Sequence, residues 1–237
     1  MATAPTAAVL TATRLALHQV AVHVLARRRH TLTGRIGLRP APGGLATPAF
    51  GDGGEVVRVC GGVLVVEHDG ALVSTPLTTL AAAADLVGVD LAADLSVGRD
   101  TPPLADPSAP LALDAGAVRA LGDWWGLGAT VLDEVAALPL VSAASAPQIW
   151  PEHFDHAAVV EAGGARFNVG ASPGDGGEPG PYLYVGPWGD DRPGDPAYWN
   201  APFGAVLRRA DLEGAGPDER RDRALAFVRQ GLSAARG

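Results

Sequence analysis

Lysine is absent from this chain, and all 18 of its basic residues are arginine. A P-loop nucleotidase needs a lysine beside the phosphates and a Schiff-base enzyme needs a lysine nucleophile, so both classes are excluded. Acidic residues outnumber basic ones, which gives a formal net charge of −8. Because nucleic-acid binding depends on a continuous Lys/Arg surface, we expect no nucleic-acid partner.

Cysteine and long apolar runs are also scarce. The single cysteine, Cys60, has no partner for an intramolecular disulfide, which is typical of a reducing compartment. We find no uninterrupted apolar run of membrane-spanning length, and the Thr/Ala/Pro-rich start of the chain lacks the basic region of a signal peptide. We therefore expect a cytoplasmic protein with no membrane partner.

The 237 residues are 47% hydrophobic and 19% charged, which is ordinary for a globular chain. A chain of this length can bury a core without a metal or a disulfide, so we expect neither a structural metal nor a cofactor. We expect a single domain over residues 1–237, with halves at 1–98 and 111–237 and a proline-rich linker at 99–110.

The first half begins with a segment, residues 6–29, that is free of proline and glycine and predicts a helix. It is apolar on two sides, which indicates burial on both, inside the protein or at a homodimer contact. The run Arg27-Arg28-Arg29 lies at its expected end, where positive charge suits the helix dipole. A short strand at 34–38 and a loop at 40–54 follow.

Two-residue turns then predict antiparallel hairpins in both halves. Gly61-Gly62 and Asp69-Gly70 separate strands at 55–60, 63–68 and 71–75, with Val59 opposite Leu64, and a helix follows at 77–87. In the second half, a helix at 115–138 precedes strands at 155–162, 165–171 and 181–186 and a final helix at 217–235.

The predicted fold class is therefore α+β. Each of the two halves is expected to contain a helix, a three-stranded antiparallel meander and a second helix, in that order. This similarity suggests a structural duplication. The helix at 115–138 contains four glycines, at 116, 122, 126 and 128, and we interpret them as sites of close approach to another helix.

Aromatic and acidic residues concentrate in one window, residues 150–203, where eight acidic residues stand against two arginines. With Gly163-Gly164 as the turn, strand alternation separates the side chains of this window into two faces. His156 falls on the apolar face and is expected to be a core histidine. The polar face gathers His153, Asp155, Asn168, Ser172, Tyr182 and Tyr184.

His153 and Asp155 are the candidate catalytic pair, because a carboxylate that accepts from an imidazole orients the ring for acid–base chemistry. Tyr184 or Ser172 would be the proton donor. Ser172 lies in a Ser-Pro-Gly-Asp turn rather than a nucleophile elbow, which disfavours covalent serine catalysis. His153-Phe-Asp155 also matches half of a facial triad, but no histidine follows His156, so we expect no metal site.

Two tryptophans, Trp150 and Trp188, stand at the ends of predicted strands. Beside carboxylates they suit stacking on a sugar or enclosure of a cation, or they simply cover the end of the sheet. The expected ligand-binding residues are Trp150, Asn168, Ser172, Asp175, Tyr182, Tyr184 and Trp188.

Three motifs, Trp150-Pro-Glu-His-Phe-Asp, Ser172-Pro-Gly-Asp and Tyr182-Leu-Tyr-Val-Gly-Pro-Trp, resemble those of an uncharacterised bacterial family, a domain of unknown function. Residues 34–39 and 46–48 resemble the same family, so the resemblance covers most of the chain. It implies one continuous unit and supplies no activity. The characteristic positions it implies are Trp150, His153, Asp155, Ser172, Asp175 and Trp188.

Three functions are compatible with these patterns. The first is binding of a small polar or cationic molecule in an acidic, aromatic-lined cleft. The second is a hydrolase- or lyase-type enzyme that uses His153 and Asp155 as its acid–base pair. The third is an interaction protein with no small-molecule site, in which the polar face is plain solvent-exposed sheet.

Overall fold

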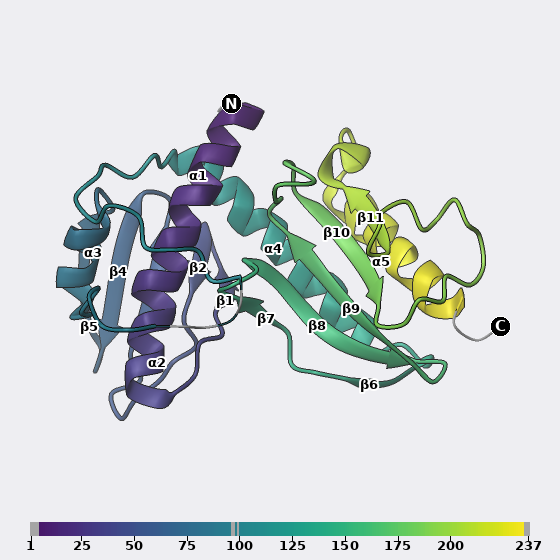
Figure 1. Ribbon diagram of the computed structural model, residues 1–237, viewed down its shortest axis with the longest axis horizontal. Coiled ribbons are helices and arrows are strands. Elements are labelled where there is room, and N and C mark those ends of the chain that lie inside the picture. Colours follow the sequence, from purple (N-terminus) through teal and green to yellow (C-terminus); the bar gives the residue numbers. More distant parts are fainter. Residues whose placement is uncertain (1–4, 96–97, 99, 235–237) are drawn as a thin grey trace. The chain divides into compact units, whose positions relative to one another are not determined.

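The computed structural model describes residues 5–95, 98 and 100–234 and divides into two compact units (Figure 1). Unit 1 contains Met1–Asp123 and Ile149–Phe154, and unit 2 contains Trp124–Gln148 and Asp155–Gly237. Each unit combines helices with an antiparallel sheet, which confirms the α+β class. The boundary between the units does not coincide with the expected linker at 99–110.

Unit 1 begins with one continuous helix made of α1 (Ala7–Val20), the π-helical η1 (Ala21–Ala26) and α2 (Arg27–Thr33). It starts at Thr6, whose side chain accepts from the Val9 N–H, and ends at Gly34 with a φ of 68°. All six residues of η1 are buried. The helix is therefore buried on all sides at its centre, and the homodimer contact stays a prediction.

This helix runs past its expected end, and its three consecutive arginines have partners other than the helix dipole. Arg27 donates to the carbonyl oxygen of Asp90 at 3.1 Å, and Arg28 forms a bidentate pair with Glu55 at 2.8 Å for each bond. Arg29 donates to the Gly37 carbonyl oxygen. The dipole interpretation is thus replaced by contacts that tie the helix to neighbouring loops.

By length and composition, the segment Ala7–Thr33 meets the criteria for a membrane-spanning helix, which the sequence analysis did not expect. Half of the qualifying window is buried inside the protein, and a core helix meets the same criteria. The finding therefore assigns no location, and the cytoplasmic location stays a prediction.

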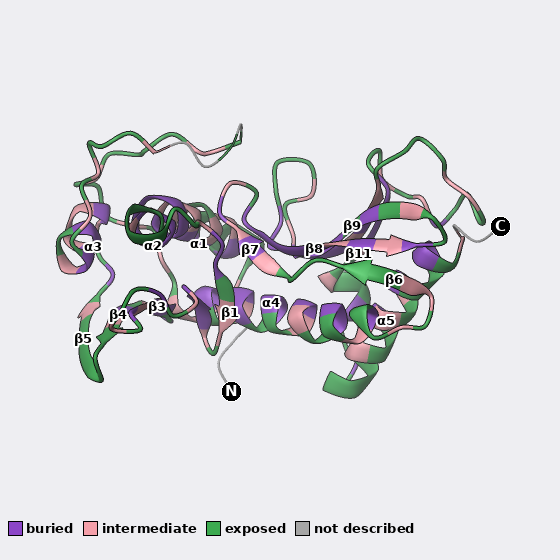
Figure 2. Ribbon diagram, turned by 90° about the horizontal axis from the view of Figure 1, so that it is seen from below, coloured by how far each residue is buried: buried purple, intermediate pink, exposed green. Residues whose placement is uncertain are grey.

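The sheet of unit 1 has five strands in the consecutive order β1-β2-β3-β4-β5. The predicted hairpin register is confirmed, with Val59 opposite Leu64 and Val66 opposite Val73. The helix α1–η1–α2 lies across one face of this sheet (Figures 1 and 2). The elements are β1 (Arg39–Ala41), β2 (Gly44–Ala46), β3 (Val56–Cys60), β4 (Val63–His68), β5 (Ala71–Pro76) and the helix α3 (Leu80–Val87).

Two expectations for unit 1 were wrong. The loop expected at 40–54 contains β1 and β2; Pro40 is tolerated because β1 is the edge strand, where no ladder partner needs its N–H. The strand expected at 34–38 is absent, and only Leu38 pairs, in an isolated bridge with Ile149. Residues 100–105 lie against the first helix, where Gln19 and His23 bond the carbonyl oxygens of Pro103 and Pro102.

Unit 2 contains a sheet whose main path has the order β11-β10-β9-β8-β6. The three predicted strands are present, and β6 and β11 extend the meander on its two sides. The strand β7 (Gln148–Trp150) lies where the chain passes between the units. The other elements are α4 (Ala115–Ala136), β6 (Val141–Ala144), β8 (Asp155–Ala162), β9 (Ala165–Ser172), β10 (Tyr182–Pro187), β11 (Ala205–Arg208), the short 3₁₀ helix η2 (Arg209–Leu212) and α5 (Pro217–Ala234).

The core of unit 2 forms where α4 and α5 cover one face of this sheet (Figure 2). Phe167, Val169 and Leu183 point from the strands into that layer, and Val228 meets them from α5. His156 is buried on the same face, as expected for a core histidine. The opposite face of the sheet therefore carries the predicted polar residues.

Two of the four glycines of α4 approach strands rather than another helix. A methyl group added at Gly122 would lie 2.4 Å from the Gly44 nitrogen of β2, in unit 1. One added at Gly128 would lie 2.4 Å from the Ala171 methyl of β9, in unit 2. The predicted contact with another helix was wrong. The spacing of the glycines indicates only that one side of α4 has no bulky side chains, and it does not indicate which element packs there.

Candidate functional site

The predicted polar face of unit 2 is present with the predicted register. Asn168 pairs with Val159 of β8 and with Gly186 of β10, and Tyr182 pairs with Ser172. Side chains two residues apart on a strand point to the same side, so these residues form rows across one face. From one end to the other, the rows are Asp155, Ser172 and Tyr182; Ala157, Gly170 and Tyr184; Val159, Asn168 and Gly186; and Glu161, Arg166 and Trp188.

The first two rows contain two hydrogen bonds between a tyrosine and an aspartate. The Tyr184 hydroxyl donates to Oδ2 of Asp155, and the Tyr182 hydroxyl donates to Oδ2 of Asp175 at 2.5 Å. Asp155 and Tyr182 are buried. Hydrogen bonds to a buried carboxylate offset its desolvation, so these tyrosines hold two acidic groups at one end of the face.

Asp175 also organises the loop that connects β9 to β10. Its Oδ1 accepts from the backbone N–H groups of Gly177 at 2.7 Å and Glu178 at 2.8 Å. The Ser172 hydroxyl oxygen accepts from the Gly174 N–H at 3.1 Å, which is the turn role expected of Ser172 as the alternative to catalysis. The Ser-Pro-Gly-Asp segment thus brings Asp175 back onto Tyr182.

Both tyrosine hydroxyls stay protonated at neutral pH. Burial raises the pKa of Tyr182, and the hydrogen bond to Asp175 raises it further. Burial and the neighbouring Asp155 carboxylate raise the pKa of Tyr184 well above its usual value. Each tyrosine therefore acts as a hydrogen-bond donor, and neither is suited to serve as a base.

Phe203 completes this end of the face, and the sequence analysis did not identify it. Its ring centre lies 6.3 Å from that of Tyr182 and 6.1 Å from that of Tyr184, edge-on to the latter. Nearly half of the Phe203 side chain is exposed. It comes from a turn before β11, a strand that the sequence reasoning missed, so no local pattern linked it to the tyrosines.

Trp188 and Asn168 meet at the other end of the face. The Trp188 indole N–H donates to Oδ1 of Asn168 at 2.8 Å. The Arg166 guanidinium lies 5.5 Å from the centre of the Trp188 ring and is held by Glu161 at 2.8 Å. Trp188 is 58% exposed, so it does not cover the end of the sheet.

Between the two ends, the face carries small side chains. Gly170 has no room for a larger residue, because an added methyl group would lie 2.8 Å from both the Tyr184 ring and the Ala157 methyl. Gly186 leaves the third row open beside Asn168. The described part of this face thus has aromatic side chains at both ends, and glycine and alanine leave it shallow between them.

The two remaining predicted residues belong to unit 1. Trp150 is half-buried at the end of β7, and its carbonyl oxygen accepts from the Phe154 N–H at 2.7 Å. His153 is exposed, with its Nδ1 lying 3.6 Å from Oδ2 of Asp100. His153 and Asp155 thus contact different groups, Asp100 and Tyr184, and the catalytic pair stays a prediction.

His18 of the first helix holds the segment around His153. Its Nε2–H donates to the Pro151 carbonyl oxygen at 2.7 Å, and its ring stacks on Phe154 at 4.6 Å between ring centres. Phe154 has a φ of 60°, a strained conformation for a residue with a side chain. Burial lowers the pKa of His18 to about 4, so this imidazole is neutral at pH 7.

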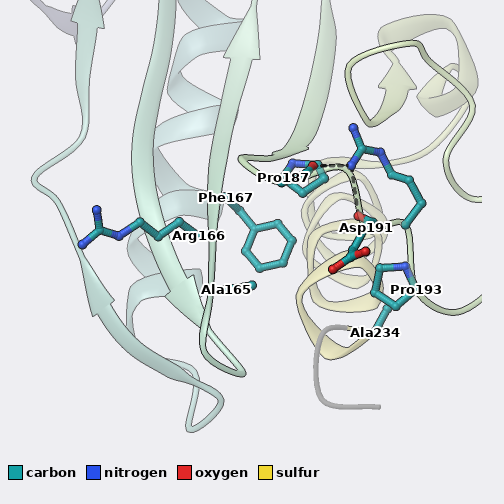
Figure 3. Close-up of a pocket in the computed structure, with 9 residues that line it drawn as sticks. Ala165, Arg166, Phe167, Pro187, Asp191, Pro193 and Ala234 are labelled. Atoms are coloured by element: carbon teal, nitrogen blue, oxygen red, sulfur yellow. Dashed lines mark hydrogen bonds between the residues drawn. The ribbon is translucent and has the colours of Figure 1, made fainter.

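A cavity of about 640 Å³ lies elsewhere in unit 2, at the turn that joins β8 to β9 and beside the end of α5 (Figure 3). None of the predicted site residues lines it. Its nine lining residues are Ala165, Arg166, Phe167, Pro187, Gly189, Asp191, Arg192, Pro193 and Ala234.

Unit 1 has a more polar cavity of about 510 Å³, which includes Phe50, Asp52 and three residues that form a charged cluster. In this cluster the buried Glu55 is paired with Arg28, and its Oε2 lies 3.8 Å from Nδ1 of His68. No local sequence pattern links the members of this cluster, because they are far apart in the chain. Because its one carboxylate is already paired with Arg28, the cluster gives no preference for a particular ligand.

Among the residues that the structure describes, no three His, Cys, Asp or Glu side chains gather in a way that would hold a metal ion. Comparison of the chain with models of protein families, with curated proteins and with solved structures finds no match in any of the three. The function therefore has to be argued from the geometry of the two units.

Proposed function

We propose that unit 2 binds a small polar or cationic molecule on the face of its sheet that carries Tyr182, Tyr184 and Trp188. One observation carries this proposal: the Arg166 guanidinium already lies 5.5 Å from the centre of the exposed Trp188 ring. A cation over an indole at this distance is attracted by the negative face of the ring. A ligand cation would make the same contact on this surface.

The electrostatics of the face support a cation more than an anion. Asp155 and Asp175 lie at one end, and Glu161 lies beside Arg166 at the other. Trp188 directly follows β10 and is four residues from Tyr184, or about 13 Å for extended chain. This spacing accommodates a ligand of one or two rings that lies over Gly186 and contacts aromatic side chains at both ends.

The two other functions have no comparable observation in their favour. An acid–base mechanism needs His153 and Asp155 to act on one substrate, and each has a separate partner. A pure interaction surface does not require two hydrogen-bonded tyrosine–aspartate pairs beside its exposed aromatic residues. Both stay predictions.

A thermal-shift screen of the full chain tests the proposal with tetramethylammonium, arginine, glucose and adenosine monophosphate. A compound at about one hundred times its dissociation constant stabilises the protein by roughly 2.7 kcal/mol, which is several degrees in midpoint. We expect a cation or a sugar to give this shift and Trp188→Ala to abolish it. Asp155→Asn should weaken the binding of cations and spare that of sugars.

Leu72→Ala is the matched control, because Leu72 of unit 1 is a large apolar side chain as exposed as Trp188, at 57%. It should leave the shift unchanged. A shift that survives Trp188→Ala, or a screen in which no compound shifts the midpoint, contradicts the proposal.

A further inference from the structure

The cavity beside α5 in unit 2 has apolar walls. Phe167, which is only 2% exposed, lies at its base on the helix-covered face of β9, and Pro187, Pro193 and Ala234 lie around it (Figure 3). Its volume of about 640 Å³ is within the range of small-molecule pockets. Rigid proline and aromatic walls lose little conformational entropy on binding, so the cavity suits a small apolar body.

Two arginines line this cavity, which at first indicates a site for an anion. Both guanidinium groups have partners elsewhere. Arg166 pairs with Glu161 and stacks over Trp188, and Figure 3 shows its side chain extending to the side of β9 opposite Phe167. Arg192 donates to the carbonyl oxygens of Gly189 at 2.7 Å and Asp191 at 3.0 Å.

Arg192 also stacks over Trp199, with 5.7 Å from the guanidinium carbon to the ring centre. These contacts close the loop onto itself and orient Asp191. Figure 3 shows the Asp191 carboxylate directed toward the Phe167 ring, between Pro187 and Pro193. Of the nine lining residues, Asp191 is thus the one whose charge faces the apolar walls.

We propose that this cavity is a second binding site, for a primary amine with a small aromatic or aliphatic body. The ammonium group would pair with Asp191, and the apolar body would lie against Pro187 and Pro193. A charged partner with an apolar body uses both properties of the cavity, whereas a carboxylate ligand would be repelled by Asp191. This site shares no ligand-contacting side chain with the face proposed above.

Titration calorimetry of the full chain tests this assignment with three probes of the same shape: benzylamine, benzyl alcohol and benzoate. We expect benzylamine to bind, benzyl alcohol to bind about tenfold more weakly and benzoate to show no binding, because only the ammonium group gains a charge-assisted hydrogen bond. Asp191→Asn should weaken benzylamine binding about tenfold. The matched control is Asp190→Asn, which removes the same charge one residue away, outside the lining, and should change nothing.

Ala165→Leu places a larger side chain in the cavity and should weaken binding of both benzylamine and benzyl alcohol, with an unchanged unfolding midpoint as the check on folding. Trp188→Ala should leave benzylamine binding intact, which separates this site from the sheet face. Four results overturn the assignment: no binding of benzylamine, tighter binding of benzoate, equal binding by Asp191→Asn, or loss of binding on Trp188→Ala.

Discussion

The helix α4 packs on both sheets, and the two contacts differ in what meets its glycines. In unit 1, Gly122 lies against the main chain of Gly44, with no side chain on either residue. In unit 2, Gly128 lies against the methyl group of Ala171. The first contact cannot be relieved by shortening a side chain, and the second can. The same residue type in one helix therefore tolerates change very differently in the two units.

The buried histidines extend this comparison. His18 of unit 1 donates to the Pro151 carbonyl oxygen, whereas Nδ1 of the buried His156 in unit 2 has no hydrogen-bond partner among the described residues. Burial lowers the pKa of both side chains to about 4. The two units thus share a sensitivity to acid, although one histidine contributes a hydrogen bond and the other mainly fills space.

Gly122→Ala should be the most destabilising of the substitutions. The added methyl group would lie 2.4 Å from the Gly44 nitrogen, so the main chain of α4 or β2 must move, at a cost of about 3 kcal/mol. Urea unfolding measures this loss. The matched control is Gly126→Ala in the same helix, where nothing lies within 4 Å and the helix should gain up to about 1 kcal/mol. Equal changes in unfolding free energy at the two positions would show that the close contact of Gly122 with Gly44 is not what makes Gly122→Ala destabilising.

Lowering the pH from 7 to 5 should cost about 2 kcal/mol for each of the two histidines. Their folded-state pKa of about 4 lies below the ordinary value of 6.5, so the unfolded chain binds these protons more readily. Their contribution to stability is present above pH 6.5 and is lost as the pH falls toward 4. Urea unfolding at both pH values measures it.

His156→Leu separates the two histidines. It should remove about 2 kcal/mol of the pH dependence with little change at pH 7, whereas His18→Leu should remove as much and also destabilise the protein at pH 7 through the lost bond to Pro151. If the free energy of unfolding of His156→Leu depends on pH as it does in the parent chain, burial of the neutral His156 imidazole is not the cause of that dependence.

Gly128→Ala should cost about 1.5 kcal/mol, because a methyl group would meet the Ala171 methyl at 2.4 Å. Ala171→Gly should rescue part of this loss. A double-mutant cycle should therefore show a favourable coupling of about 1 kcal/mol. If the stability changes of the two substitutions simply add, the destabilisation by Gly128→Ala arises within the helix and not from its contact with β9.

Trp188→Ala should have the smallest effect on stability, within about 0.5 kcal/mol, because most of its side chain is exposed. Leu72→Ala in unit 1 should be equally mild. The two variants should differ only in ligand binding, which isothermal titration with the best compound of the screen measures. A large loss of stability in Trp188→Ala would make Trp188 a structural residue of the hairpin.

Local signals in the sequence predicted most of the fold. Gly163-Gly164 and Gly61-Gly62 are two-residue turns, and such a turn determines which residues of two adjacent strands lie opposite each other. The short strands β1, β2, β6, β7 and β11 were missed. Pro40 and the glycines nearby make the stretch around β1 and β2 typical of a loop, and the pairing of short strands depends on neighbours already in place.

The candidate site was predicted in part. The shared face of Asp155, Asn168, Ser172, Tyr182 and Tyr184 follows from strand alternation, which the sequence shows. Trp150 was added because it is close in the chain, and His153 because the strand alternation was extended past Asp155. The strand β8 begins at Asp155, and the structure places Trp150 and His153 in the other unit.

The sequence by itself determined the α+β class, the strand register and the side chains that share a face of the second sheet. Each of these follows from turns of two residues and from alternation along a strand, which are local properties. Only the tertiary structure decided three contacts. Tyr184 donates a hydrogen bond to Asp155, the Phe203 ring lies against the tyrosine rings, and the Arg166 guanidinium lies over the Trp188 ring. Those contacts depend on where the loop after β9 and the turn before β11 lie, which is set by packing between distant segments.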